Sequence, residues 1–469
     1  MAGGESSDLP PAKMMPDPSR SPFLCPMRVL LLLNALVVAL LAEGQSDRIR
    51  VYFNQPTDPA VSTGTLAISL GQAMDDTIEA YIDRAQYTID VAVYNANDYS
   101  ILYALNDAKD RGVQVRYITE GTQSNTGLPM LDPAIPVLER TDGQGSGMHN
   151  KFMSIDADHA DLAWVWTGST NWTQNGLFDD YNNMVFIQHQ GLALAYRAEF
   201  EEMWGSSGPQ PNVANSRFGA QKTNNTAHSF DVDGVLVESF FSPSDGTTAR
   251  IVEAIDDAQS SVHGALFAFT NSSIGAALLA ADMLPDRVVR LDLEEPITSG
   301  TQGWFLAING VDVASHSSDD VQLHHKYAIV DAGTSDDPLV ITGSHNWSNY
   351  AETINDENTL IIHDATVANL FLQEWSARRN DVVGVGEDLR TLRLEAWPRP
   401  ASDVLHVRLP DTMHDAALLL YDATGRAVRQ WHGTGAARTL SVADLPAGLY
   451  TLQCTGPAAR EACAVVIVR

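Results

Sequence analysis

The segment His149-Asn-Lys-Phe-Met-Ser-Ile-Asp156, followed by Thr167-Gly-Ser-Thr-Asn-Trp172, decides the fold because it occurs twice. The second copy reads His324-His-Lys-Tyr-Ala-Ile-Val-Asp331, followed by Thr342-Gly-Ser-His-Asn-Trp347. Each matching residue of the second copy lies 175 positions after its counterpart in the first, with no gap inside the blocks. Two gapless blocks of this length predict one structural unit that is used twice.

The same alternation of elements surrounds both copies of the motif. Before the first copy, the apolar periodicity predicts a strand from Ile49, helices over 73–85 and 100–110, and strands over 88–94 and 112–118. Before the second copy, it predicts strands over 237–242, 262–269 and 287–293 and a helix over 251–259. Such alternation indicates α/β layers. We therefore expect a pseudo-dimer of two α/β lobes, at residues 45–215 and 216–390.

Each motif carries side chains that can act on a phosphodiester. Histidine can attack or donate a proton near neutral pH, and lysine offers a compact cation for anionic oxygens. A His-x-Lys segment followed by apolar residues predicts a strand with His and Lys on one face. The chain has only five lysines, and two of them, Lys151 and Lys326, occupy equivalent motif positions.

These residues resemble the phospholipase D superfamily, whose members carry His-x-Lys-x4-Asp followed by Gly-Ser-x-Asn in two copies. The resemblance implies a phosphodiesterase in which one histidine attacks phosphorus and forms a phosphohistidine, while the other protonates the leaving alcohol. We expect His149 to be the nucleophile and His324 the acid, with the reverse assignment open. The resemblance also implies that lysines replace a metal, so we expect no metal and no other cofactor.

The resemblance carries roles for the remaining motif residues. Lys151 and Lys326 are expected to hold the non-bridging oxygens, and Asp156 and Asp331 to position the motif. The expected phosphate-binding residues are Ser169, Asn171, Ser344 and Asn346.

In this family an acidic residue after the motif commonly holds the second nitrogen of the catalytic imidazole. Glu357 fits this role for the second copy, but its counterpart in the first copy is Asn182. We therefore expect either that Asp180 substitutes or that a neutral partner orients the first imidazole.

The net charge of −30 argues against a broad basic groove for nucleic acid and against tight docking on anionic membranes. We expect a phospholipid substrate, cleaved at the head group, with nucleic acid or another phosphodiester as the alternative. One chain contains both halves, so we expect a monomer.

The two ends of the chain predict export. Residues 1–44 combine Arg28 with a short apolar run ending near Ala42, which is typical of a secretory signal, with an uncleaved anchor as the alternative. Met27 is an alternative start. Short strands and Gly/Pro turns over 391–469 predict a small all-β sandwich.

Trp397-Pro-Arg-Pro-Ala-Ser-Asp403 and Leu445-Pro-Ala-Gly-Leu-Tyr450 resemble the C-terminal sorting domain of type IX secretion cargo, with Arg399 in place of the usual Asn. The resemblance implies a partner, the type IX machinery, and a secreted or cell-surface location. Export also permits a Cys454–Cys463 disulfide, without requiring it.

Overall fold

The computed structural model describes residues 46–141, 147–317 and 321–383, and, in the C-terminal part, residues 394–397, 401–409, 413, 415–422, 425–435, 437–455 and 460–469. The expected signal in residues 1–44, the position of Arg399 and parts of the two loops before the motifs lie outside the described residues.

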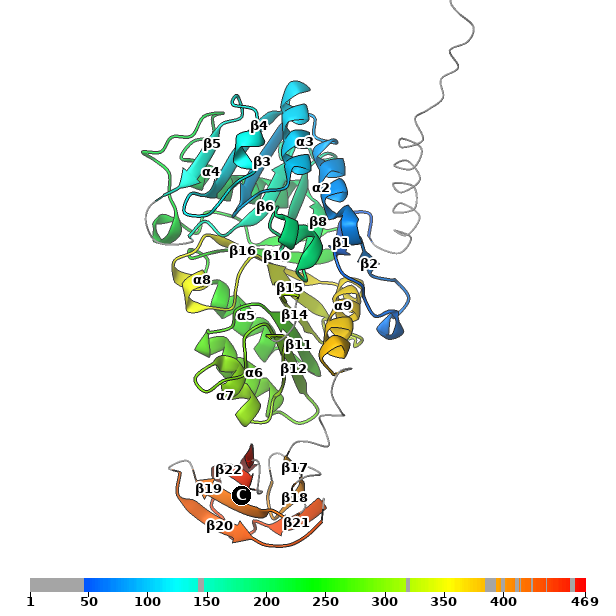
Figure 1. The fold of residues 1–469 in the computed structure, drawn as a ribbon, viewed down its shortest axis with the longest axis vertical. Helices are drawn as coiled ribbons and strands as arrows, with labels where there is room; N and C mark the ends of the chain where they lie inside the picture. Colours follow the sequence, from blue (N-terminus) through cyan, green and yellow to red (C-terminus); the bar gives the residue numbers. More distant parts are fainter. Residues whose placement is uncertain are drawn as a thin grey trace, which may run out of the picture. The chain divides into compact units, whose positions relative to one another are not determined.

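The first lobe contains an eight-stranded sheet in the order β2-β1-β8-β7-β6-β3-β4-β5. Helix α3 packs against β4, and α4 packs against β6, β7 and β3 (Figure 1). The motif strand β6 lies inside the sheet between β7 and β3, so all five of its residues are buried. The elements of this lobe are β1 (Ile49–Phe53), β2 (Ile68–Ser69), α2 (Met74–Ile82), β3 (Thr88–Val93), α3 (Tyr99–Asp110), β4 (Gln114–Glu120), β5 (Val137–Arg140), β6 (Lys151–Ile155), β7 (Trp164–Gly168), β8 (Asn183–Gln188) and α4 (Gln190–Trp204).

The second lobe repeats this sheet with the order β13-β12-β11-β14-β15-β16-β10-β9, so that β14 occupies the place of β6. In Figure 1, α5, α6 and α7 lie on one side of this sheet and α9 on the other. Its elements are β9 (Ser229–Val232), β10 (Val235–Ser242), α5 (Thr247–Asp256), β11 (Ser261–Leu266), α6 (Ser272–Asp282), β12 (Val288–Leu293), α7 (Gln302–Ile308), β13 (Asp312–Ser315), β14 (Lys326–Val330), β15 (Leu339–Gly343), α8 (Asn349–Thr353), β16 (Glu357–His363) and α9 (Ala365–Val383). The predicted α/β duplication is confirmed.

One continuous apolar core joins the two lobes. It includes Phe53 of β1, which meets Phe371 of α9 edge to face with ring centroids 5.2 Å apart. At the equivalent place in the other half, Tyr196 of α4 meets Phe241 of β10 at 5.0 Å. Burying aromatic rings from both lobes together makes their separation costly.

A segment of the first lobe, residues 56–67, lies along α9 of the second lobe and is called the strap below. The amide N–H of Asp58 donates to the carbonyl of Gln373 at 2.8 Å. The Gln373 side chain accepts from the N–H of Ala67 at 3.0 Å and donates to the carbonyl of Thr65 at 2.9 Å. The strap therefore fixes the last helix of the second lobe to the start of the first.

The C-terminal residues form a small β domain with a three-stranded sheet, β17-β18-β21, and a four-stranded sheet, β20-β19-β22-β23, around its own apolar core. Its strands are β17 (Glu395–Trp397), β18 (Val404–Arg408), β19 (Ala417–Asp422), β20 (Ala427–Trp431), β21 (Ala437–Ser441), β22 (Gly448–Thr455) and β23 (Arg460–Ile467). The predicted all-β domain is confirmed.

The two cysteines of this domain are buried and are not joined by a disulfide. Cys454 is paired with Glu461 and Cys463 with Leu452, so the cysteines occupy diagonal positions of the ladder. In the part of the chain that the structure describes, no helix has the length and apolar character needed to cross a bilayer.

Candidate active site

The two histidines lie just before their motif strands and are held by the opposite lobe. The sequence predicts that the strands include His149 and His324, but β6 and β14 begin at Lys151 and Lys326. The N–H of His149 donates to the carbonyl of Asp356 at 3.0 Å. In the other half, the N–H of His324 donates to the carbonyl of Tyr181 at 3.1 Å. Each histidine leaves its own sheet because its backbone is hydrogen-bonded across the lobe interface.

The two motifs meet across the lobe interface, where Nδ1 of His149 lies 2.8 Å from Oε2 of Glu357 and Asn358 Nδ2 donates to Oδ1 of Asn150 at 3.1 Å. Burial lowers the pKa of His324 well below 6.5, and Lys326, Lys151 and His149 lower it further. The pKa of Lys326 is likewise lowered well below 10.5, by burial and by the Lys151 ammonium. Burial also lowers the pKa of His149, against the opposing effect of Glu357. Cationic and imidazole groups that were 175 residues apart in the sequence thus share one buried environment.

Each lysine folds back over its own histidine and packs on an aromatic ring. Lys151 Nζ donates to the carbonyl of His149 at 2.9 Å, lies 3.3 Å from the imidazole Nε2 and is 5.2 Å from the ring centroid of Tyr94. Lys326 Nζ donates to the carbonyl of His324 at 2.5 Å and is 4.6 Å from the ring centroid of Phe267. Burial lowers the pKa of Lys151 to about 7.

The imidazole partners are crossed between the lobes. Nδ1 of His149 is 2.8 Å from Oε2 of Glu357, and Nδ1 of His324 is 2.9 Å from Oδ1 of Asn182. The expectation that Glu357 serves the histidine of its own copy is therefore wrong, since it holds His149 of the other lobe. The neutral partner, Asn182, belongs to His324.

Asp180 does not substitute for an imidazole partner. Among the described residues, its carboxylate makes no hydrogen bond to either histidine, and its backbone carbonyl accepts from the Asn54 side chain. Burial raises the pKa of the Asp180 carboxyl, and Lys326 opposes that shift.

The serines of the Gly-Ser-x-Asn segments hold the imidazole partners. Ser169 Oγ donates to Oδ1 of Asn182 at 2.7 Å, and Ser344 Oγ donates to Oε2 of Glu357 at 2.7 Å. Their hydroxyl protons are thus engaged by the imidazole partners, and phosphate binding by these serines stays a prediction.

Asn171 and Asn346 remain predicted phosphate ligands. Within the described residues, neither makes a side-chain hydrogen bond, and the Oδ1 atom of each is buried without a partner. Both amides are therefore available to a bound group.

The motif aspartates organise the far ends of their strands. Asp156 accepts from the backbone N–H groups of Gln86, Tyr87 and Thr88, each at 2.8 Å. Asp331 makes the equivalent contacts with residues 259–261. Seven extended residues place Asp156 roughly 20 Å from His149. The aspartates thus hold the turn before the neighbouring strand and do not reach the histidines.

Two equivalent carboxylates were not predicted as site residues. Glu120 is the last residue of β4 and Glu294 follows β12, and each accepts at 2.8 Å from the backbone N–H of the residue before a motif histidine, Met148 or Leu323. Each lies within two residues of the end of the third predicted strand of its lobe, which was the available sequence signal.

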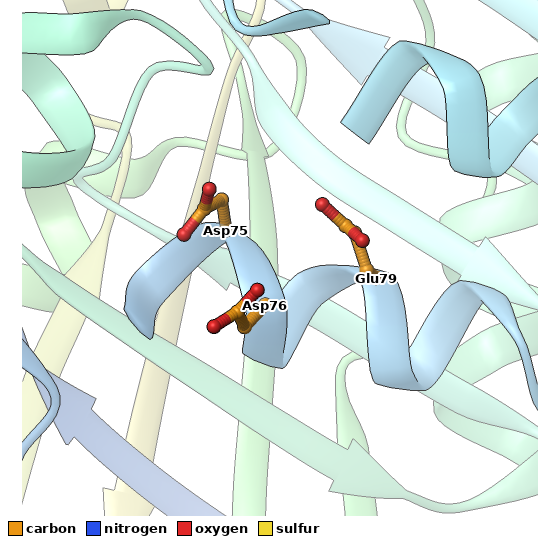
Figure 2. A group of neighbouring side chains, drawn as sticks. All are labelled: Asp75, Asp76 and Glu79. Atoms are coloured by element: carbon orange, nitrogen blue, oxygen red, sulfur yellow. The ribbon is translucent and has the colours of Figure 1, made fainter. Parts of the chain in front are cut away.

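One group of carboxylates has the spacing of a cation site. Asp75, Asp76 and Glu79 project from the first turns of α2, and their ligand oxygens lie within 4.8 Å of one another (Figure 2). Burial and the neighbouring carboxylates raise the pKa of Asp75 and of Glu79. Exposed acidic clusters are common on helices, and this one contains no motif residue.

Comparison with known proteins supports both resemblances drawn from the sequence. A family model described as "Cardiolipin synthase, PLD-like domain" matches residues 78–204 and 251–378, which include both motif copies. A second, described as "Secretion system C-terminal sorting domain", matches residues 395–468.

Several curated proteins are similar to the lobes. The mitochondrial cardiolipin hydrolase of Mus musculus is 32% identical over 202 residues, which are 41% of this chain and 87% of that protein. The human protein of the same name is 35% identical over 131 residues, or 27% of this chain, and the match spans about half of its length (48%). A phospholipase D of Rickettsia prowazekii is 30% identical over 144 residues, covering 30% of this chain and 67% of that protein.

Proposed function

The chain belongs to the phospholipase D-like family, and from that premise we propose that it is an exported phosphodiesterase that hydrolyses phospholipid head groups through a phosphohistidine. The observation that carries this proposal is the crossed pairing, in which His149 has an anionic partner and His324 a neutral one.

The pairing supports His149 as the nucleophile. A carboxylate that accepts the Nδ1 proton leaves the lone pair on Nε2, the atom that must attack phosphorus. The same carboxylate stabilises the positive charge that develops on the imidazole as the N–P bond forms. Glu357 is suited to this task because its pKa is lowered by the adjacent His149 despite its burial.

His324 would act on the other side of the phosphorus. As the N–P bond to His149 forms, the P–O bond to the head-group alcohol breaks, and His324 Nε2–H gives its proton to that oxygen. In the second step His324 takes a proton from water, the water oxygen attacks phosphorus and the N–P bond breaks. The products are the free alcohol and a phosphate monoester, and both histidines return to their initial state.

To act as the acid, His324 must be protonated, although its pKa is low in the free protein. Binding of an anionic phosphodiester between Lys151 and Lys326 offsets their positive charge and adds a negative one. Opposite charge favours the protonated form of an imidazole, so substrate binding would itself raise the pKa of His324. Asn171 and Asn346 would add neutral donors to the phosphoryl oxygens.

Two observations support a lipid substrate. Similar proteins are named for cardiolipin and for phospholipid. The net charge of −30 opposes the phosphate neutralisation on which nucleic-acid binding relies, although it also opposes tight docking on an anionic lipid surface. The sorting-domain match supports export and engagement of a secretion machinery.

The test compares three substrates with the purified protein in EDTA: phosphatidylcholine vesicles, cardiolipin-containing vesicles and single-stranded DNA. We expect phosphatidic acid or its equivalent from vesicles and no DNA cleavage. DNA cleavage without lipid turnover would replace the lipid assignment by a nuclease.

Matched variants connect any turnover to the site. His149→Ala and His324→Ala should each abolish turnover of every diester without loss of the folded structure. Substantial activity in both variants, or loss of wild-type activity on adding EDTA, would contradict the metal-free two-histidine mechanism.

A further inference from the structure

Asp356, the residue before Glu357, is the centre of a buried ionic network. Its Oδ2 accepts from Arg140 Nη1 at 2.6 Å, and its Oδ1 accepts from the Gly219 N–H at 2.7 Å and lies 3.5 Å from Lys222 Nζ. Lys222 also pairs with Glu199. The four charged side chains are at most 2% exposed. Two cations and two anions therefore balance one another away from solvent.

The network draws on three parts of the chain. Arg140 ends β5 and Glu199 lies in α4 of the first lobe, whereas Asp356 belongs to the second. Gly219 and Lys222 lie in residues 205–228, the segment between α4 and β9 that is called the connector below.

The backbone of Asp356 touches the proposed nucleophile directly. Its N–H donates to the carbonyl of Gly147 at 2.7 Å, and its carbonyl accepts from the N–H of His149 at 3.0 Å. Glu357, the carboxylate partner of His149, is the next residue in the chain. A Cβ atom on Gly147 would clash with the Arg140 guanidinium, so this glycine leaves the space that Arg140 occupies. Displacing Asp356 would thus move both ends of the His149–Glu357 hydrogen bond.

The other half has the same backbone bridge, and there Glu374, the counterpart of Glu199, pairs with buried Arg378, but the bridging residue itself carries no charge. The counterpart of Asp356, 175 residues earlier, is Tyr181, whose N–H donates to the carbonyl of Gln322 at 2.9 Å. The Tyr181 ring is only partly buried and lies 4.0 Å from the guanidinium carbon of Arg378. The bridging residue is thus charged in the half where the histidine has the anionic partner Glu357, and uncharged in the half where it has the neutral partner Asn182.

Burying four charged side chains costs desolvation free energy, and the apolar core already joins the two lobes. Desolvation of a buried ion pair often cancels its attraction, and apolar residues of similar volume can serve stability as well. A buried network does, however, fix geometry, because each charge has one well-defined place among its partners.

We propose that Asp356 is a positioning residue for the His149–Glu357 pair, held in place by Arg140 and by the connector through Gly219 and Lys222. This inference rests on the proposed function, and it makes the connector part of the catalytic support.

The first test is Asp356→Asn, which keeps the shape and the backbone bridge but removes the charge. With bis(p-nitrophenyl) phosphate as substrate, we expect kcat to fall at least about tenfold, which corresponds to about 1.4 kcal/mol. KM should stay within about threefold, since the phosphate-binding lysines are untouched.

A second readout does not depend on turnover. We expect the His149 Nδ1 proton shared with Glu357 to give a downfield proton resonance, identified by its shift in Glu357→Gln. In Asp356→Asn we expect this resonance to shift or to broaden through exchange with water. If the wild-type protein hydrolyses no diester, the proposed function fails, and the resonance still tests the positioning.

Lys222→Met provides an independent variant, with Lys109→Met as the matched control. Lys109 is partly exposed beside Asp110 and Asp132, so the same replacement there removes the same charge without touching the network. We expect a several-fold fall in kcat for Lys222→Met and none for Lys109→Met. Thermal unfolding identifies a variant that fails to fold. If Asp356→Asn fails to fold, the inference is tested by the kcat of Lys222→Met alone. Wild-type kcat with an unchanged resonance in the folded variants would overturn the inference.

Discussion

Replacing Glu357 by glutamine tests the crossed pairing most directly. The carboxylate accepts from His149 Nδ1 at 2.8 Å, from Ser344 Oγ at 2.7 Å and from Asn355 Nδ2 at 3.0 Å. A glutamine oxygen can still face His149 and Ser344, which leaves its NH2 group facing Asn355. The Oδ1 of Asn355 is buried without a partner, so this amide can turn and accept from the glutamine. We therefore expect the variant to fold.

The expected loss of activity follows from the lost charge. A hydrogen bond to an ionised group contributes about 1.5–3 kcal/mol, and a neutral one about 0.5–1.5 kcal/mol. Glu357→Gln exchanges a charged hydrogen bond for a neutral one, a difference of about 1–1.5 kcal/mol, so at 1.36 kcal/mol for each factor of ten it should lower kcat by about 5- to 13-fold. Asn182→Ala, at the equivalent position of the other lobe, removes a neutral bond and should cost about 2- to 10-fold.

The assay is steady-state hydrolysis of bis(p-nitrophenyl) phosphate by both variants, with circular dichroism as the control for folding. Wild-type kcat in Glu357→Gln together with a fall of kcat in Asn182→Ala would refute the assignment of His149 as the nucleophile. Wild-type kcat in Glu357→Gln would refute the carboxylate's part in the reaction altogether.

Three further predictions follow from the site and the strap. His324→Ala removes the group that activates water, whereas the leaving group of bis(p-nitrophenyl) phosphate needs no acid. With this substrate a phosphoryl adduct should therefore accumulate on the peptide containing His149, as detected by mass spectrometry. An adduct on another peptide would contradict the mechanism. Because burial lowers the pKa of Lys151 to about 7, this lysine loses its charge as pH rises through that value, so kcat/KM should fall above about pH 7, and a flat profile to about pH 9 would contradict its role. Gln373→Ala removes two hydrogen bonds between α9 and the strap and should lower the free energy of unfolding by about 1–3 kcal/mol in denaturant titrations, with kcat unchanged in the folded protein.

The sequence was sufficient for the architecture because the repeat is gapless and the hydrophobic periodicity is regular. Equal spacing identified β6 with β14 and predicted that both motifs occupy the same place in their sheets. The alternation of short strands and turns likewise predicted the C-terminal β domain.

The pairing of the histidines could not be obtained in the same way. The offset of 175 shows that Glu357 and Asn182 are equivalent, but equivalence does not tell which of two histidines each one contacts. In a pseudo-twofold arrangement a residue at the interface can face the copy of its partner in the other lobe. Only the three-dimensional structure distinguishes the two choices, and it shows the contact between lobes.

The serines were assigned to the phosphate for a similar reason. Their position in the motif predicts proximity to the histidines, which is correct, but not the direction of a hydroxyl proton. Ser169 and Ser344 donate to Asn182 and Glu357, so their hydroxyl protons are engaged by the imidazole partners, and their contact with phosphate stays a prediction.

The exchange of partners between halves makes the duplicated chain different from a symmetric pair of either half. Two identical first halves would combine two histidines with two asparagines, and two identical second halves would combine them with two glutamates. Only the covalent fusion of unlike halves guarantees one anionic and one neutral partner around a single phosphorus. Divergence at the position shared by Asn182 and Glu357 could therefore specialise the two imidazoles without altering either motif.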